Sequence, residues 1–160
     1  LEDDNSEIRK CAAESLGKMG NILAVDPLLR CLKDKTSEVK NTAAVSLGTL
    51  KTEKAVDPLL EILKEEDSEL RITAVYALGS IGSRKAIDPL LKMLDDSSPW
   101  VRRYTVEALG KIGDKKAIAP LVKNLNDPDP EVRWATAETL RILDTRRSQE
   151  KIQKEIQFQL

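Results

Sequence analysis

A cluster of aromatic and charged side chains near the middle of the chain is the set best suited to chemistry at a surface. It consists of Trp100, Arg103, Tyr104, Glu107 and Lys111. Their spacing of three or four residues places them on one face of a helix. Trp, Tyr and Arg are the residue types most enriched at the hot spots of protein interfaces. The chemistry that this cluster offers is non-covalent recognition.

Catalysis and metal binding have few candidate residues. The chain contains no His, which is the usual proton-transfer residue at neutral pH and the commonest metal ligand. Cys11 and Cys31 have no His to activate them and are too few for a zinc site made of thiolates. We therefore expect no catalytic residue, no bound metal and no cofactor.

A period of 31 residues organises the elements that must position the cluster. The strings AVDPLL, AVDPLL, AIDPLL and AIAPLV begin at residues 24, 55, 86 and 117. A Leu-Gly pair recurs with the same period, from Leu16-Gly17 to Leu109-Gly110. Such a period is typical of a repeat array in which each unit packs against its neighbours.

Each repeat is predicted to form two amphipathic helices. Apolar residues recur at helical spacing in both halves of a repeat, as at Val39, Leu47 and Leu50 in a first half. N-cap residue types precede every first helix: Asn5, Thr36, Asp67, Ser98 and Asp129. Left-handed caps are expected after it at Gly20, Gly82 and Gly113, and Lys51 is the exception in this column. A Pro inside the second half predicts an irregular or 3₁₀ turn before the second helix begins.

Glycines inside the first helices predict close helix packing. Gly17, Gly48, Gly79 and Gly110 recur at one column of the repeat. A mid-helix Gly costs about 1 kcal/mol relative to Ala. Its recurrence indicates that a larger side chain would collide with a neighbouring helix.

Two charged columns have a structural interpretation. A basic column holds Arg9, Lys40, Arg71, Arg102 and Arg133, and an acidic column holds Asp3, Asp34, Glu65, Asp96 and Asp127. The basic column could bind phosphate, but its one-to-one match with the acidic column favours a ladder of ion pairs. The net charge of −1 also makes nucleic acid an improbable partner.

Other columns vary freely, and they include the cluster of the first paragraph. The column of Arg103 also contains Lys10, Asn41, Ile72 and Trp134, and Tyr76 occupies the column of Glu107. Both Trp and both Tyr of the chain fall in such columns. We predict a recognition surface made of Ile72, Tyr76, Trp100, Arg103, Tyr104, Glu107 and Trp134. The alternative is that these rings only cover gaps between repeats.

The repeat resembles the HEAT-like repeat of the phycobilin (PBS) lyase type. The matching residues are Val101-Arg102, then the run from Ala108 to Asp114, then the run from Ala117 to Val122. The resemblance extends over about residues 1–143. It implies a right-handed α-solenoid whose first helices form a concave recognition face. It also allows a subunit of a bilin lyase, in which this face would hold an open-chain tetrapyrrole.

We expect one domain over residues 1–160, with repeats at about 3–33, 34–64, 65–95, 96–126 and 127–157. Residues 146–157 are expected to cap the array, because polar residues replace apolar ones on one side of that segment. Leu1 falls in the column of Leu32, which suggests that the chain is a fragment of a longer array.

The predicted function is that of a non-catalytic binding or scaffold module for a protein partner. The alternatives are the bilin lyase subunit and a structural spacer in a multidomain protein. The residues present contain no signal peptide and no apolar stretch approaching a membrane span. We therefore expect a cytoplasmic protein that does not associate with membranes.

Overall fold

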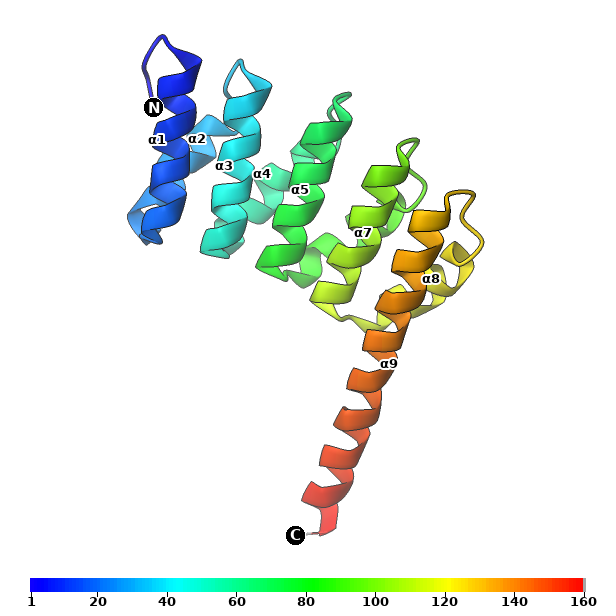
Figure 1. The fold of residues 1–160 in the computed structure, drawn as a ribbon. Coiled ribbons are helices and arrows are strands. Elements are labelled where there is room, and N and C mark those ends of the chain that lie inside the picture. The colour runs from blue at the N-terminus through cyan, green and yellow to red at the C-terminus, as the bar shows by residue number, and fades with distance from the viewer. Residues whose placement is uncertain (160) are drawn as a thin grey trace.

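Two rows of helices form the molecule (Figure 1). The structure is a computed structural model that describes the backbone of residues 1–159 and the side chains of residues 1–144. The first helices are α1 (Ser6–Met19), α3 (Ser37–Leu50), α5 (Ser68–Ile81), α7 (Pro99–Ile112) and α9 (Pro130–Gln159). The second helices are α2 (Val25–Cys31), α4 (Val56–Ile62), α6 (Ile87–Met93) and α8 (Ile118–Asn124). The described residues contain no strand, so the prediction of an all-α solenoid is confirmed.

A short 3₁₀ helix connects the two helices of each of the first four repeats, as the proline positions predict. These connections are η1 (Ile22–Ala24), η2 (Glu53–Ala55), η3 (Arg84–Ala86) and η4 (Lys115–Ala117). The C-cap residue of each preceding first helix has a left-handed backbone, with φ of 66° at Gly20, 77° at Gly82 and 75° at Gly113, as expected. Lys51, the expected exception, adopts the same conformation with φ of 50°. Lys51 is the costly member of this set, because a Cβ disfavours that conformation.

The core consists of the apolar columns. Val39, Val101 and Val132 are fully buried in the first helices α3, α7 and α9, and Leu28, Leu59, Leu90 and Leu121 are fully buried in the second helices. Ile8 belongs to the same column as Val39 but is 51% exposed. No repeat packs on that side of α1 in the described structure, so its apolar side chain remains open.

The mid-helix glycines allow the first helices to approach closely, as predicted. A Cβ added at Gly48 would lie 2.9 Å from Ala77 Cα on the next first helix. The same addition at Gly79 would lie 2.8 Å from Ala108 Cα. Both distances are shorter than a Cβ contact can be, so a larger residue would push the repeats apart.

The fifth repeat differs from the predicted helix pair. Helix α9 continues without interruption from Pro130 to Gln159, and Figure 1 shows it extending beyond the other helices. The turn and the separate second helix that were expected there are therefore absent from residues 130–159. Side chains after Asp144 lie outside the described residues, so the capping role of residues 146–157 stays a prediction.

Candidate recognition face

The two rows of helices are spaced unequally. Each first helix packs along its length against the next first helix, from α1 to α9, whereas the second helices pack mainly against first helices. Grooves of about 700 Å³ between α2 and α4 and about 460 Å³ between α6 and α8 separate the second helices. The closely spaced row must lie on the inside of the curve, so the first helices form the inner face of the array.

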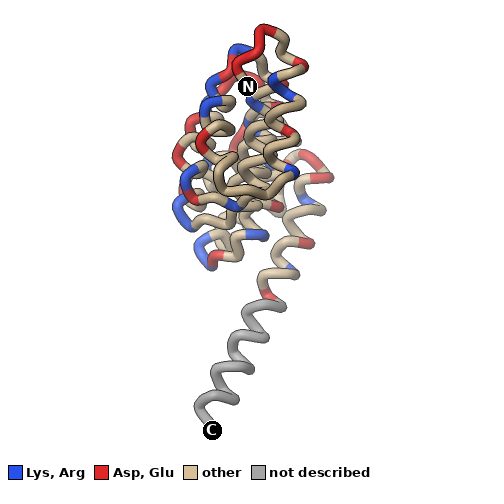
Figure 2. Tube along the Cα trace, turned by 90° about the vertical axis from the view of Figure 1, so that its left-hand side faces the viewer, with Lys and Arg blue, Asp and Glu red and all other residues tan. Residues whose placement is uncertain are grey.

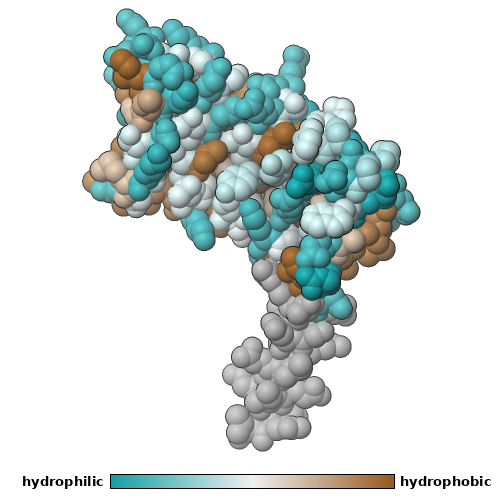
Figure 3. Space-filling model, viewed as in Figure 1, coloured by the Kyte–Doolittle hydropathy of each residue, from teal (hydrophilic) through white to brown (hydrophobic). Residues whose placement is uncertain are grey.

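All seven predicted site residues lie on first helices. Helix α5 carries Ile72 and Tyr76, α7 carries Trp100, Arg103, Tyr104 and Glu107, and α9 carries Trp134. The exposed fractions are 52% for Trp100, 64% for Trp134 and 41% for Tyr76. Figure 3 views the row of first helices and shows hydrophobic patches between hydrophilic side chains. The rings of Trp100, Trp134 and Tyr76 are therefore accessible to solvent on this row of helices.

Four residues of α7 hold one another in place. The Arg103 guanidinium carbon lies 5.7 Å from the centre of the Trp100 ring and 5.9 Å from that of the Tyr104 ring. Arg103 Nε also lies 3.3 Å from Glu107 Oε1. Cation–π contacts at such sites contribute about 0.5–1 kcal/mol each. These contacts hold the Arg103 guanidinium in one orientation on α7.

A second cation joins neighbouring repeats on the same face. Lys111 Nζ of α7 lies 4.5 Å from the centre of the Tyr76 ring of α5. The Tyr76 ring covers one side of the Lys111 ammonium group, and the N–H donors on its other sides remain exposed. Tyr76, which the sequence placed in the recognition set, is thus connected to the α7 cluster.

A groove of about 320 Å³ lies between α7 and α9 on this face. Glu107, Lys111, Trp134, Glu138 and Ile142 are among the residues that line it. Its size suits one or two bulky apolar side chains, and Trp134 and Ile142 provide exposed apolar surface. The sequence prediction omitted Glu138 and Ile142, although each occupies a column of the named set, 31 residues after Glu107 and Lys111.

Two predicted site residues also have a packing role. Ile72 and Tyr104 are half-buried and pack against the hydrophobic core. Ile72 and Tyr104 therefore lie at the base of the inner face, whereas most of the surface of Trp100 and Trp134 is exposed. The alternative that rings cover gaps between repeats therefore applies in part to Tyr104.

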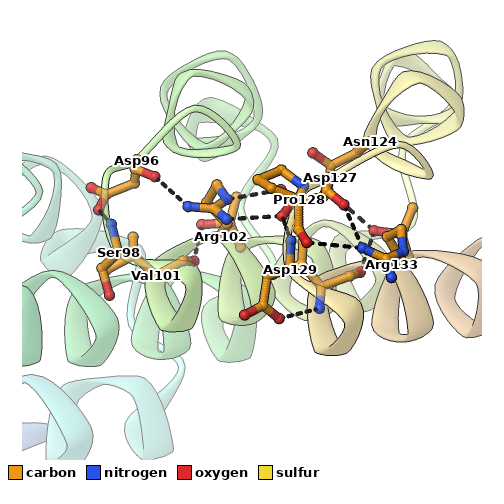
Figure 4. A network of polar contacts seen from close by, with 12 residues as sticks. Asp96, Ser98, Val101, Arg102, Asn124, Asp127, Pro128, Asp129 and Arg133 are labelled. Atoms are coloured by element: carbon orange, nitrogen blue, oxygen red, sulfur yellow. Dashed lines mark hydrogen bonds and ion pairs between the residues drawn. The ribbon is translucent and has the colours of Figure 1, made fainter.

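The basic column forms the predicted ladder between repeats. Arg9, Arg71 and Arg102 each donate two hydrogen bonds of 2.7–3.0 Å to the carboxylate of Asp34, Asp96 and Asp127, one repeat further on. Figure 4 shows Arg102 between Asp96 and Asp127, with Arg133 in the same position one repeat later. Nη1 of each of these arginines donates to backbone carbonyls of the preceding turn.

These ion pairs lower the pKa values of the carboxylates. The hydrogen bonds from Arg9 lower the pKa of Asp34 to about 2. Those from Arg102 hold the pKa of Asp127 below its ordinary value. Because the arginines are already satisfied, the ladder stabilises the repeats and does not present a phosphate-binding stripe.

The remaining polar residues were compared with the requirements of metal binding and nucleophilic attack. No group of three potential ligands occurs among the described residues. Burial raises the pKa of the Cys31 thiol, which makes it a poor nucleophile. Cys11 is exposed and free. Among the described residues, no helix is both long and apolar enough to cross a bilayer.

The fold and the repeat columns define a helical repeat solenoid, and comparison with known sequences gives its family. The family model described as HEAT repeats matches residues 1–48, 33–103 and 87–154. The chain therefore belongs to the HEAT-repeat family. No curated protein matches the sequence.

Solved structures share the architecture. The complex of CpcE and CpcF of phycocyanin lyase from Nostoc sp. PCC7120 is similar, with a TM-score of 0.79 and 29% identity over 89% of this chain and 62% of that chain. A designed armadillo repeat protein in complex with the peptide (KR)4 gives a TM-score of 0.67 and 22% identity over 89% of this chain and 78% of that one. The chain thus spans less than two thirds of the lyase chain that it resembles.

Proposed function

We propose that this chain is a non-catalytic binding module that holds a protein partner on its inner face. The observation that supports the proposal most is the exposure of Trp100 and Trp134 at 52% and 64%, on the row of helices where the core columns are fully buried. Large rings placed in solvent by a rigid scaffold lose little conformational freedom when a partner covers them, which favours affinity.

The charge distribution favours a protein over a nucleic acid. Arg9, Arg71 and Arg102 are engaged in the ladder, and Figure 2 shows basic and acidic residues interspersed along the chain. Nucleic acid binding requires basic side chains that are free to displace counterions from phosphates. We also propose a cytoplasmic location, which the two free cysteines support.

Quantitative affinity capture tests the proposal. The wild type, the variant W100A/W134A and the control V122A/L125A are used to retain proteins from cell extract. Val122 and Leu125 are exposed apolar residues of the second-helix row, so the control removes similar surface elsewhere. We expect a defined partner to be retained by the wild type and the control and lost with W100A/W134A. Equal retention by all three folded proteins would contradict the proposal.

A second candidate is a tetrapyrrole-binding subunit of a bilin lyase. The similarity to the phycocyanin lyase complex favours it, and the oriented Arg103 guanidinium could pair with a bilin propionate. Addition of a bilin to the protein tests this directly. A shifted bilin absorbance that disappears in R103A would support this candidate, and an unchanged spectrum would remove it.

A further inference from the structure

One column of the repeat places a carboxylate at the edge of the inner face in four of the five repeats. Its members are Glu7, Glu38, Glu69, Trp100 and Glu131, one from the first turn of each first helix. Glu7 is ion-paired, because its Oε2 lies 2.9 Å from Lys10 Nζ. The carboxylates of Glu38, Glu69 and Glu131 are exposed and have no basic partner among the described residues. These three residues are called the acidic row below.

The inner face as a whole has an excess of negative charge. Its variable columns hold the acidic residues Glu7, Glu14, Glu38, Glu69, Glu107, Glu131 and Glu138, but only the basic residues Lys10, Lys18, Arg103 and Lys111. Lys10, Lys18 and Arg103 are each engaged with a glutamate of their own helix, and Lys111 lies over the Tyr76 ring. Glu138 is likewise paired within α9. The surplus negative charge is therefore that of the acidic row.

The second helices show how the same protein treats first-turn carboxylates that it neutralises itself. An acidic residue in the first turn is favourable for any helix, and α2 and α6 have Asp26 and Asp88 there. Each of these is met by a lysine of the next repeat, since Lys54 Nζ lies 3.4 Å from Asp26 and Lys116 Nζ lies 3.5 Å from Asp88. The acidic row has no such lysine among the described residues. Helix stability thus explains the carboxylates but not the lack of counter-charge, which a partner can supply.

The exposed tryptophans give a cation a second kind of contact on this face. Trp134 lies three residues after Glu131 on α9, so the two side chains are neighbours on the helix surface. Its ring is 64% exposed, and no cation lies over it among the described residues. A Lys or Arg side chain placed over this ring gains a cation–π contact and lies within reach of the Glu131 carboxylate. The groove between α7 and α9, which Trp134 lines, adjoins this position.

The length of the acidic row defines the shape of the partner. Packed helices lie about 8–10 Å apart, so the three helix spacings from Glu38 to Glu131 extend over about 24–30 Å. An extended chain advances about 3.3 Å per residue and covers this distance with about eight residues. An extended segment can also follow the curve of the inner face, whereas a straight helix would contact only part of the row.

We propose that the inner face binds an extended segment of a partner protein that is rich in Lys and Arg. Basic side chains of the segment pair with Glu38, Glu69 and Glu131, and the one at Glu131 also lies over the Trp134 ring. An apolar side chain of the segment enters the groove between α7 and α9. Complementary charge of this kind selects a basic partner and repels acidic ones. The inference rests on the proposed function, since it names the partner chemistry of the same face.

Selection from a displayed library of random peptides of about twelve residues tests the inference. The library is selected separately against the wild type, E38Q/E69Q/E131Q, W100A/W134A and the control D26N/D57N/D88N, all checked for folding by circular dichroism. The control removes equally many exposed first-turn carboxylates from the second-helix row. We expect the wild type and the control to enrich Lys and Arg. Fluorescence polarisation should show that E38Q/E69Q/E131Q and W100A/W134A each bind the wild-type peptides at least about tenfold more weakly.

The results that would overturn the inference differ in what they imply for the proposed function. Peptides that are lost with W100A/W134A but lack Lys and Arg, or bind E38Q/E69Q/E131Q as tightly as the wild type, would remove the basic segment and leave the recognition face intact. If the enriched peptides bind both variants as tightly as the wild type, the inference and the proposed function are both wrong. A selection that enriches no peptide also overturns the inference, and the affinity capture described above then decides the proposed function by itself.

Discussion

Single residues determine how tightly consecutive repeats are joined. Arg71 reaches across to the next repeat and at the same time binds two carbonyls of its own preceding turn. Arg9 and Arg102 do the same in their repeats. One side chain therefore fixes both the turn and its neighbour. A guanidinium can do this because it presents five donors in a planar arrangement.

The acid stability of the protein should depend on Asp34. Its folded pKa of about 2 lies below the ordinary Asp value of about 3.9. The ion pair therefore contributes its full stabilisation above about pH 4 and loses it as the pH falls toward 2. We expect D34N to lower the free energy of unfolding by about 1–3 kcal/mol near neutral pH. Urea titrations at several pH values measure this.

The control for that prediction is D26N, because Asp26 is exposed and has only a 3.4 Å contact to Lys54. D26N should retain the stability of the wild type within about 0.5 kcal/mol. If D34N is as stable as D26N near neutral pH, the ladder does not join the repeats as described.

The ion pair that joins the second repeat to the third has fewer hydrogen bonds than the Arg–Asp pairs of the ladder. Lys40 makes a single contact of 2.9 Å with Glu65, where the first, third and fourth repeats have a two-bond Arg–Asp pair. The double variant K40R/E65D reproduces the pair of the other repeats and adds donors for the preceding carbonyls. We expect it to raise the free energy of unfolding by about 1 kcal/mol. Thermal unfolding measures the change, and a decrease in stability would show that the local backbone does not fit Arg.

At the scale of the elements, the distance between first helices is set by glycine. Gly79 lies against Ala108 of the next helix, and this contact brings α5 and α7 together along their length. The second helices have no equivalent contact with one another and leave grooves between them. The inner face is thus a consequence of residue size at one column of the repeat.

The variant G79A tests this account of helix spacing. Helix propensity alone would make it more stable by about 1 kcal/mol, whereas the added Cβ would lie 2.8 Å from Ala108 Cα and force the helices apart. We expect the steric effect to dominate and the free energy of unfolding to fall by about 1–3 kcal/mol. S80A, one residue further along α5, is the control. A G79A protein more stable than the wild type would contradict close packing at this column.

Most of the elements could be predicted from the sequence because each has a local chemical cause. The N-caps, the left-handed residues and the proline positions define helix ends without reference to tertiary contacts. The continuous α9 was not predicted, although Asp144 stands in the column of the left-handed cap Gly113 and no Pro follows it as in the earlier repeats. The groove between α7 and α9 also lacked a sequence signal, because its shape depends on how the two helices pack against each other.

At the scale of the whole molecule, the columns of the repeat that stabilise the fold are different from the columns that line the inner face. The columns that face between the two rows of helices are buried and keep their apolar character. The columns on the inner face change from repeat to repeat, so its chemistry can vary without loss of the fold. Trp100 replaces a Glu that the other four repeats have at the start of the first helix, where an acidic residue is favourable. This replacement has no benefit for the helix itself, which supports a role in binding.

Acrylamide quenching of tryptophan fluorescence tests the central claim most directly, because both tryptophans of the chain lie on the inner face. The account predicts that Trp100 and Trp134 are readily quenched in the folded protein, each measured in a single-tryptophan variant. Bound partner should protect both and shift their emission to shorter wavelength. Tryptophans that resist quenching in the free folded protein, or remain equally quenched when a partner is bound, would contradict it.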